Sequence, residues 1–356
     1  MNRTINEQKQ KRWFMATLAG AGGILLLLLA AMAVVDPYFH YHKAIPGISY
    51  RLYSERYMNR GIAKNFEYDA LITGSSMNQN FKTSLMDELF GSNSIKIPFS
   101  GAGFEEIGDT INAALSSGNE VKYVLWGLDY NGLNREYNWQ GYEEYPEYLY
   151  DNNLLNDVSY VWNKTILFEG LFTDLLLTLQ GEETTTFDEY SSWEAGRGWE
   201  SISQTYQRRE EILPMEKVTE GTKERVRRNI TENIVTLANQ YPDTQFLLFY
   251  TPYSALYWES IYRDGTLEKQ LELEALATEL LLECDNVKLY SFARETKITE
   301  NLELFRDKEH YVAEVNDLIL TWIAEDYGRV TRENYQDLIR WEYDYYMNYD
   351  YDRLYE

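Results

Sequence analysis

The segment DALITGSSMN, residues 69–78, is a short apolar run that leads directly into a Gly-Ser-Ser turn. The run is nearly continuous in apolar residues, which is typical of a strand covered on both faces of a sheet. A helical pattern follows, so the turn joins a strand to a helix. This arrangement places Ser75 and Ser76 at the carboxyl edge of the predicted sheet, where open α/β sheets bind their ligands. The following helix also directs backbone N–H groups and the positive end of its dipole toward that edge.

Four further apolar runs have the same character as Asp69–Thr73. They are Ser94–Pro98, Tyr123–Leu128, Gln245–Tyr250 and Val287–Phe292. Helical patterns lie between or after the runs, at Phe81–Phe90, Glu105–Ser116, Thr222–Gln240, Leu267–Glu283 and Glu309–Tyr327. Strands that alternate with helices predict an α/β domain with a doubly wound, parallel, five-stranded sheet between two helical layers. We expect this three-layer domain to cover residues 66–330.

Two segments do not fit the alternating pattern. A stretch from about residue 130 to 216 is too long for a structureless loop in a compact domain, so it predicts a large insertion. This insertion is dense in Tyr, Trp and acidic residues, for example in Tyr142–Tyr148. It would form either a lid over the substrate or a structural elaboration. The Tyr- and acid-rich tail, residues 331–356, is either a docked helix, a frayed end or a surface that stacks on glycans.

The N-terminal region contains one candidate membrane span, Trp13–Val35, which has no charge and is rich in Leu, Ala and Gly. As a helix it would be about 34 Å long, enough to cross a hydrocarbon core of about 30 Å. Lys9, Lys11 and Arg12 precede it, and the positive-inside rule therefore keeps residues 1–12 in the cytoplasm.

The rest of the chain, beginning with a juxtamembrane segment at residues 36–65, is then expected outside the cytoplasm. A cleaved signal peptide is the alternative, because Ala31-Met32-Ala33 has the small-x-small pattern of a cleavage site. Both interpretations place the folded domain in the same compartment.

The charge of the chain limits its partners. It has 57 acidic and 33 basic residues, for a formal net charge of −24. An acidic surface repels phosphate backbones, so we expect no nucleic-acid partner. The single cysteine, Cys284, excludes an intrachain disulfide. We identify no metal site and expect no cofactor.

A possible general base lies far downstream of the serine turn. The chain has three histidines, and His40 and His42 are close to the predicted span. His310 is therefore the histidine available to the folded domain, unless it serves only as a surface or helix-capping residue. Asp307, three residues earlier, can bind Nδ1–H of His310 and leave Nε2 free to accept a serine proton.

These motifs together resemble the SGNH/GDSL hydrolase superfamily. Gly74-Ser75-Ser76 resembles its block I, with Ser76 in the nucleophile position, and Asp307-x-x-His310 resembles block V. Ser100-Gly101-Ala102-Gly103 is similar to block II, which implies that Gly101 and Ser76 donate backbone N–H groups to an oxyanion hole. The fold implied is a flavodoxin-like parallel sheet.

Block III departs from the family pattern, because Asp129 stands where an oxyanion-hole asparagine is expected. An ionised carboxylate would repel an oxyanion, so Asn131 or Asn78 would have to supply the missing donor. Ser75, Asp129, Thr251 and Tyr253 are expected to line the substrate cleft; the Thr251-Pro252-Tyr253 segment is alternatively a simple turn.

Among relatives, the one-span arrangement resembles bacterial envelope proteins that O-acetylate polysaccharides or transfer D-alanine to teichoic acids. The resemblance implies a single-pass protein of the bacterial plasma membrane, with a multispanning membrane-bound O-acyltransferase as its partner. It would be a serine esterase or acyltransferase that acts on O-acyl groups of envelope glycan through a Ser76 acyl-enzyme. The alternative is a catalytically silent, membrane-tethered scaffold for that partner.

Overall fold

The computed structural model describes residues 2–141, 146–151, 153, 155–194 and 196–355. By contacts the chain divides into two units. Unit 1 comprises Met1–Leu52 and Pro146–Thr185, and unit 2 comprises Tyr53–Tyr145 and Thr186–Glu356. The predicted insertion is therefore shared between the two units. Residues 142–145 of its Tyr- and Glu-rich stretch lie outside the described residues.

Unit 2 is built on a six-stranded sheet in the order β2-β1-β3-β4-β5-β6. The strands are β1 (Ala70–Gly74), β2 (Ser94–Lys96), β3 (Tyr123–Leu128), β4 (Gln245–Tyr250), β5 (Val287–Ser291) and β6 (Arg329–Val330). The first five are parallel, as predicted, and β6 is antiparallel to β5. The expected count of five strands was therefore wrong: β6 is only two residues long, too short to produce a periodic sequence pattern.

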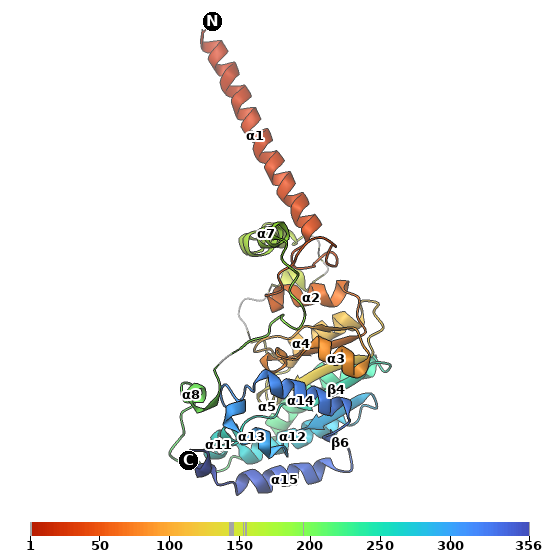
Figure 1. Cartoon of the computed structure of the whole chain (residues 1–356), viewed down its shortest axis with the longest axis vertical. Coiled ribbons are helices and arrows are strands. Elements are labelled where there is room, and N and C mark those ends of the chain that lie inside the picture. Colours follow the sequence, from red (N-terminus) through yellow and green to blue (C-terminus); the bar gives the residue numbers. More distant parts are fainter. Residues whose placement is uncertain (1, 142–145, 152, 154, 195, 356) are drawn as a thin grey trace. The chain divides into compact units, whose positions relative to one another are not determined.

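Unit 2 also contains twelve α-helices within the described residues. They are α2 (Glu55–Asn65), α3 (Thr83–Phe90), α4 (Phe104–Leu115), α5 (Tyr130–Leu133), α8 (Gly198–Ile202), α9 (Glu220–Ile230), α10 (Thr236–Gln240), α11 (Ala255–Arg263), α12 (Leu267–Leu281), α13 (Thr296–Thr299), α14 (Ala313–Ala324) and α15 (Tyr335–Met347). One set of contacts joins α3 to α14 (Figure 1), and another joins α9 to α12. Right-handed crossovers place these two sets on opposite faces, because the strand order reverses between β1 and β3. The carboxyl ends of β1 and β3 thus form the switch point at which such sheets bind ligands.

Two helix predictions differ from the structure. The expected helix Thr222–Gln240 is interrupted by a π-helical turn, Thr231–Val235, between α9 and α10. The last predicted helix begins only at Ala313, because residues 306–310 form a bend that is closed by a bridge between Phe305 and Tyr311. This bend carries the candidate base and its aspartate.

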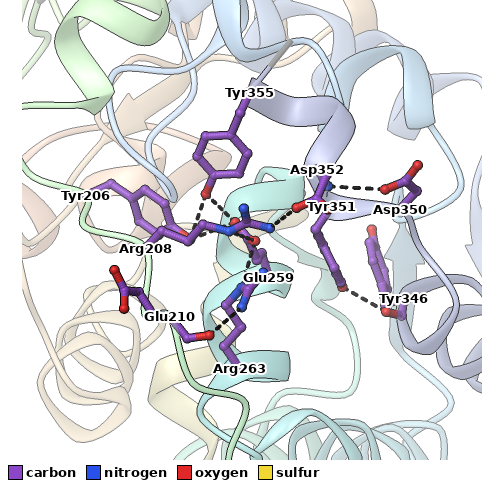
Figure 2. A network of polar contacts seen from close by, with 10 residues as sticks. All are labelled: Tyr206, Arg208, Glu210, Glu259, Arg263, Tyr346, Asp350, Tyr351, Asp352 and Tyr355. Carbon is purple, nitrogen blue, oxygen red and sulfur yellow. Dashed lines mark hydrogen bonds and ion pairs between the residues drawn. The ribbon is translucent and has the colours of Figure 1, made fainter.

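The C-terminal tail is docked on unit 2, which agrees with the docked-helix interpretation. Helix α15 packs on α12, and a short 3₁₀ helix, Tyr351–Tyr355, follows it. There Tyr355 donates a hydrogen bond to the fully buried carboxylate of Glu259 on α11 (Figure 2). Arg208 and Arg263 also bind this carboxylate, with N–O distances of 2.6 and 2.9 Å. A buried anion with two cationic partners holds the tail against the domain.

Unit 1 contains α1 (Asn2–Val35), a 3₁₀ turn at Glu147–Leu149, α6 (Val158–Val161), a π-helical turn at Ile166–Leu171 and α7 (Phe172–Gln180). Within the described residues, one helical stretch, Lys9–Val35, is long and apolar enough to cross a membrane, with a mean hydropathy of 2.5. The buried carboxylate of Asp36 follows it and accepts hydrogen bonds from three successive backbone N–H groups, those of residues 40–42.

Candidate active site

The serine turn has its shape because two glycines face each other across neighbouring strands. Gly74 ends β1 with a φ of +135°, and it pairs with Gly127 of β3. A Cβ atom on either glycine would collide with the side chain of Asn78, which is fully buried between them. With Asn78 seated there, the chain turns sharply into a 3₁₀ helix that begins at Ser76. Ser75 caps this helix by accepting a hydrogen bond from the backbone N–H of Met77 at 3.2 Å.

Ser76, His310 and Asp307 form a continuous hydrogen-bonded chain. Ser76 Oγ lies 2.8 Å from His310 Nε2, and His310 Nδ1 lies 2.9 Å from Asp307 Oδ2. Oδ1 of Asp307 also accepts the backbone N–H groups of Glu309 and His310, both at 2.8 Å. The bend thus fixes Asp307, and Asp307 fixes the tautomer that leaves Nε2 free to accept a proton.

The charges of this pair stabilise each other. Burial alone would raise the pKa of Asp307, but its hydrogen bond to His310 and the imidazolium charge hold that pKa below its usual value. Burial alone would lower the pKa of His310, but the hydrogen bond and charge of Asp307, together with the carboxylates of Asp129 and Glu309, raise it. The arrangement therefore favours an imidazolium–carboxylate pair, the state formed when His310 accepts a proton from Ser76.

A pocket of about 210 Å³ opens at the carboxyl ends of β1 and β3, and Ser76 and His310 line it. Gly101, with a φ of +64°, lies on its wall. Ser76 is the first residue of its helix, and such residues have no intrahelical partner for their backbone N–H groups. The pocket is smaller than the 300–1,000 Å³ typical of sites for drug-sized ligands. Its volume suits a small acyl group.

Asp129 also lines this pocket, where hydroxyl groups surround its carboxylate. Tyr253 and Thr251 both donate to Oδ1, at 3.0 and 3.3 Å. Burial nevertheless raises the pKa of Asp129, and the hydrogen bonds from Ser75, Tyr253 and Thr251 together with the charge of His310 offset only part of that rise. Asp129 therefore holds a proton to a higher pH than an exposed aspartate does, and in that form a carboxyl group can donate a hydrogen bond.

The structure brings most of the predicted site residues together. Those that line the pocket are Ser75, Ser76, Gly101, Asp129, Asn131, Tyr253 and His310. Asp307 binds the far side of the His310 ring. Two expectations need correction. The Asn78 side chain is buried between the glycines, where it does not face the pocket, and Thr251 is fully buried behind Asp129 and binds it without lining the pocket.

Asn131 remains placed to contact a ligand, because its exposed side chain lines the pocket. The hydroxyl of Tyr257 lies 3.4 Å from its Oδ1 and orients the amide.

Three further residues near the reacting groups were not predicted from the sequence. Arg135 lines the pocket, with its guanidinium 3.5 Å from the centroid of the Trp139 ring. Glu309 lines it too, and burial raises the pKa of this carboxyl group. Trp193 contacts the His310 ring edge-on at 5.9 Å. Only Glu309 carried a sequence signal, as the neighbour of His310, whereas Arg135 and Trp193 reach the site through the predicted insertion.

Within the described residues, no three His, Cys, Asp or Glu side chains are placed to hold a metal ion.

Comparisons with known proteins give little further information. No family model matches the chain, and no curated protein matches it. Among solved structures it is similar to one described as "The structure of a putative platelet activating factor from Streptococcus pneumonia". The similarity has 12% sequence identity and a TM-score of 0.38, and it covers 76% of this chain and 89% of the other.

Proposed function

We propose that this protein is a membrane-anchored, SGNH-type serine esterase or acyltransferase that acts on O-acyl groups of envelope polysaccharide. The observation that carries the proposal is the hydrogen-bonded chain from Ser76 through His310 to Asp307 at the mouth of a small pocket. A serine hydroxyl is a weak nucleophile, and an adjacent base with an orienting carboxylate is the arrangement that activates it.

The proposed reaction has two steps. Ser76 Oγ attacks the acyl carbonyl while His310 Nε2 takes its proton, and the imidazolium then protonates the leaving alcohol. An acyl-enzyme remains on Ser76. In the second step His310 takes a proton from water or from a sugar hydroxyl, which attacks the ester and releases Ser76. The acceptor that reaches the acyl-enzyme decides between hydrolysis and transfer.

The developing oxyanion would be stabilised by the backbone N–H groups of Ser76 and Gly101. In its protonated form Asp129 would donate a third hydrogen bond, in the role that asparagine has in the family pattern. When ionised, Asp129 would oppose the reaction. This carboxylate is also the observation that favours the second candidate, a silent scaffold that positions an acyltransferase partner.

The location and substrate class rest on the N-terminal helix and the charge. A span at residues 13–35, with Lys9, Lys11 and Arg12 before it, supports a single-pass protein of the bacterial plasma membrane with its domain outside. At a net charge of −24, a neutral glycan is a better acceptor than a polyanion. A multispanning O-acyltransferase that supplies acyl groups would be a suitable partner for such an enzyme.

The test is the intact mass of the full-length protein in detergent after incubation with p-nitrophenyl acetate. We expect one acetyl adduct on the wild type, its loss in Ser76→Ala, and its retention in the neighbouring variant Ser75→Ala. Decay of the adduct in buffer would show an esterase, and faster decay with added glycan would show a transferase. A folded wild-type protein that forms no adduct and cleaves no ester would support the scaffold.

A further inference from the structure

Unit 1 exposes a row of large apolar side chains outside the predicted span. We call this row the apolar ridge; its members are Leu155, Val158, Trp162, Phe168, Phe172, Leu176 and Leu179. Within residues 155–162 around α6, and again within residues 168–179 up to the end of α7, they recur every three or four residues, so each of the two segments has one apolar face. Their exposure is high, reaching 88% at Leu155 and 86% at Leu179. Large contiguous apolar surfaces of this kind mark contact with a partner or a membrane.

The polarity of α7 is inverted relative to a helix on a water-soluble surface. Two of its polar residues point into unit 1: Asp174 Oδ1 accepts the backbone N–H of Arg51 at 2.9 Å, and Thr178 Oγ1 accepts that of Ser49 at 2.8 Å. Asp174 is 1% exposed, and burial raises its pKa to about 7. The outward face instead carries Phe172 and Leu176. A buried aspartate beneath exposed leucines is the pattern expected where the surroundings are apolar.

The ridge is fixed to the end of the predicted span. Tyr160 of α6 donates a hydrogen bond to Asp36, directly after α1, at 2.6 Å. Gly170 lies against Pro37 so closely that a Cβ atom would come within 2.9 Å of the proline ring. Figure 1 shows α7 beside the C-terminal end of α1. The ridge therefore follows the span to whatever depth the span reaches.

A groove between α1 and α6 shows which part of the span lies beside α6. It has a volume of about 550 Å³ and is lined mostly by apolar side chains, which are Leu25 and Leu29 of α1 together with Val158, Val161 and Trp162. Tyr41 and Asp157 also line it, and Asp157 is paired with His40 at 3.3 Å. At 1.5 Å per residue, Leu29 and Leu25 lie about 9 and 15 Å before the end of α1 at Val35. If Leu25 and Leu29 contact hydrocarbon, Val158 and Trp162 lie at the same depth. This continuity with the span identifies lipid as the occupant.

We propose that residues 155–179 form a second membrane contact, which lies in the outer leaflet beside the span and packs lipid acyl chains against the apolar ridge and into the groove. The exposed charges of this segment are few, namely Lys164 and Glu169, in a chain that is otherwise strongly acidic. The segment thus lacks the acidic surface that would oppose insertion. Together, span and ridge would restrict the tilt of unit 1 at the membrane, which a single helix cannot do.

The experiment measures the environment of single spin labels in the full-length chain. Cys284→Ala removes the native thiol, and single cysteines are then placed at Val158 and Leu176 of the ridge. Leu27→Cys on α1 gives the value for hydrocarbon, and Leu318→Cys, an exposed leucine on α14 of unit 2, gives the value for water. Each variant is reconstituted in phosphatidylcholine vesicles, and collision rates with O₂ and with a water-soluble nickel chelate are measured. Circular dichroism checks that each variant is folded.

We expect the ridge labels to behave like Leu27→Cys, with an O₂-to-nickel collision ratio severalfold above that of Leu318→Cys. Ridge labels that match Leu318→Cys would overturn the proposal. Labels that are nickel-accessible in pure lipid but shielded in native membranes would also overturn it, because a protein partner would then cover the ridge. None of these results depends on catalysis, so they stand or fall apart from the proposed acyl chemistry.

Discussion

Asp129→Asn would exchange one carboxylate oxygen of the pocket for an NH₂ group while keeping the shape of the side chain. Tyr253 and Thr251 both donate to Oδ1, and an amide oxygen can accept the same two hydrogen bonds. The new NH₂ group would then stand in place of Oδ2 as a permanent donor. The substitution tests directly whether Asp129 faces the oxyanion.

The size of the effect follows from two opposing terms. One oxyanion-hole donor contributes about 10²–10³ in kcat, or about 2.7–4 kcal/mol. Against this gain, the negative charge of Asp129 helps to raise the pKa of His310. Without that charge the imidazolium is less stabilised, which offsets part of the gain from the new donor. The net expectation is an increase in kcat of about tenfold to a hundredfold above the pKa of Asp129.

The pH dependence of the hydrolysis rate tests this role of Asp129. The wild type needs His310 neutral and Asp129 protonated, so its rate should fall as rising pH ionises Asp129, whose pKa burial raises. Asp129→Asn should lose this alkaline limb. Initial rates of p-nitrophenyl acetate hydrolysis between about pH 5 and 9 would show it. In a control, Tyr253→Phe removes a hydrogen bond that lowers the pKa of Asp129, so the limb should move to higher pH. A folded Asp129→Asn no faster than wild type at any pH would refute the role of Asp129.

Three further predictions concern stability. Gly74→Ala should destabilise unit 2 by about 2 kcal/mol or more, because its Cβ collides with Asn78 at a positive φ; chemical denaturation measures this, and an unchanged midpoint would contradict it. Glu342 and Glu274 are fully buried, and burial raises both pKa values, so stability should fall as pH rises from the unfolded toward the folded pKa. The free energy of unfolding of Glu342→Gln should therefore exceed that of the wild type by about 2 kcal/mol near pH 8, and the two proteins should be equally stable near pH 5. Identical melting temperatures of variant and wild type at both pH values would exclude a buried acidic pair. Glu259→Gln removes the anion that two arginines share, and it should cost about 3 kcal/mol and raise proteolysis of the C-terminal tail; a tail that stays protected would show that α15 alone holds it.

Local patterns made much of unit 2 predictable. The five parallel strands carry continuous apolar runs, and this follows from their burial on both faces. The position of the turn after β1 was predictable because Gly74 and the two serines are adjacent in the sequence. The Asp307–His310 contact was predictable for the same reason, since the two residues lie three positions apart in one bend.

The features that the sequence did not reveal depend on contacts between distant segments. Asn78 looked like an oxyanion donor, but Gly127 on a neighbouring strand leaves the space that receives its side chain. Thr251 looked like a cleft residue, yet it is fully buried and binds Asp129, which follows the neighbouring strand β3. The two-residue strand β6 exists only because β5 offers it an edge. No window of sequence contains both partners of such contacts.

The geometry of the site and the burial of Asp129 bear on the choice between enzyme and scaffold. A scaffold that has lost its chemistry has no need to hold Ser76 Oγ 2.8 Å from His310 Nε2, nor to fix Asp307 with two backbone N–H groups. It equally has no need to bury a carboxylate in the pocket that Ser76 and His310 line, since burial of a charge costs stability. An enzyme that uses the protonated form does gain from that burial, because desolvation is what keeps the proton on. Ionised Asp129 would thus repel the oxyanion, whereas protonated Asp129 would stabilise it. The rate would therefore depend on the pH outside the membrane.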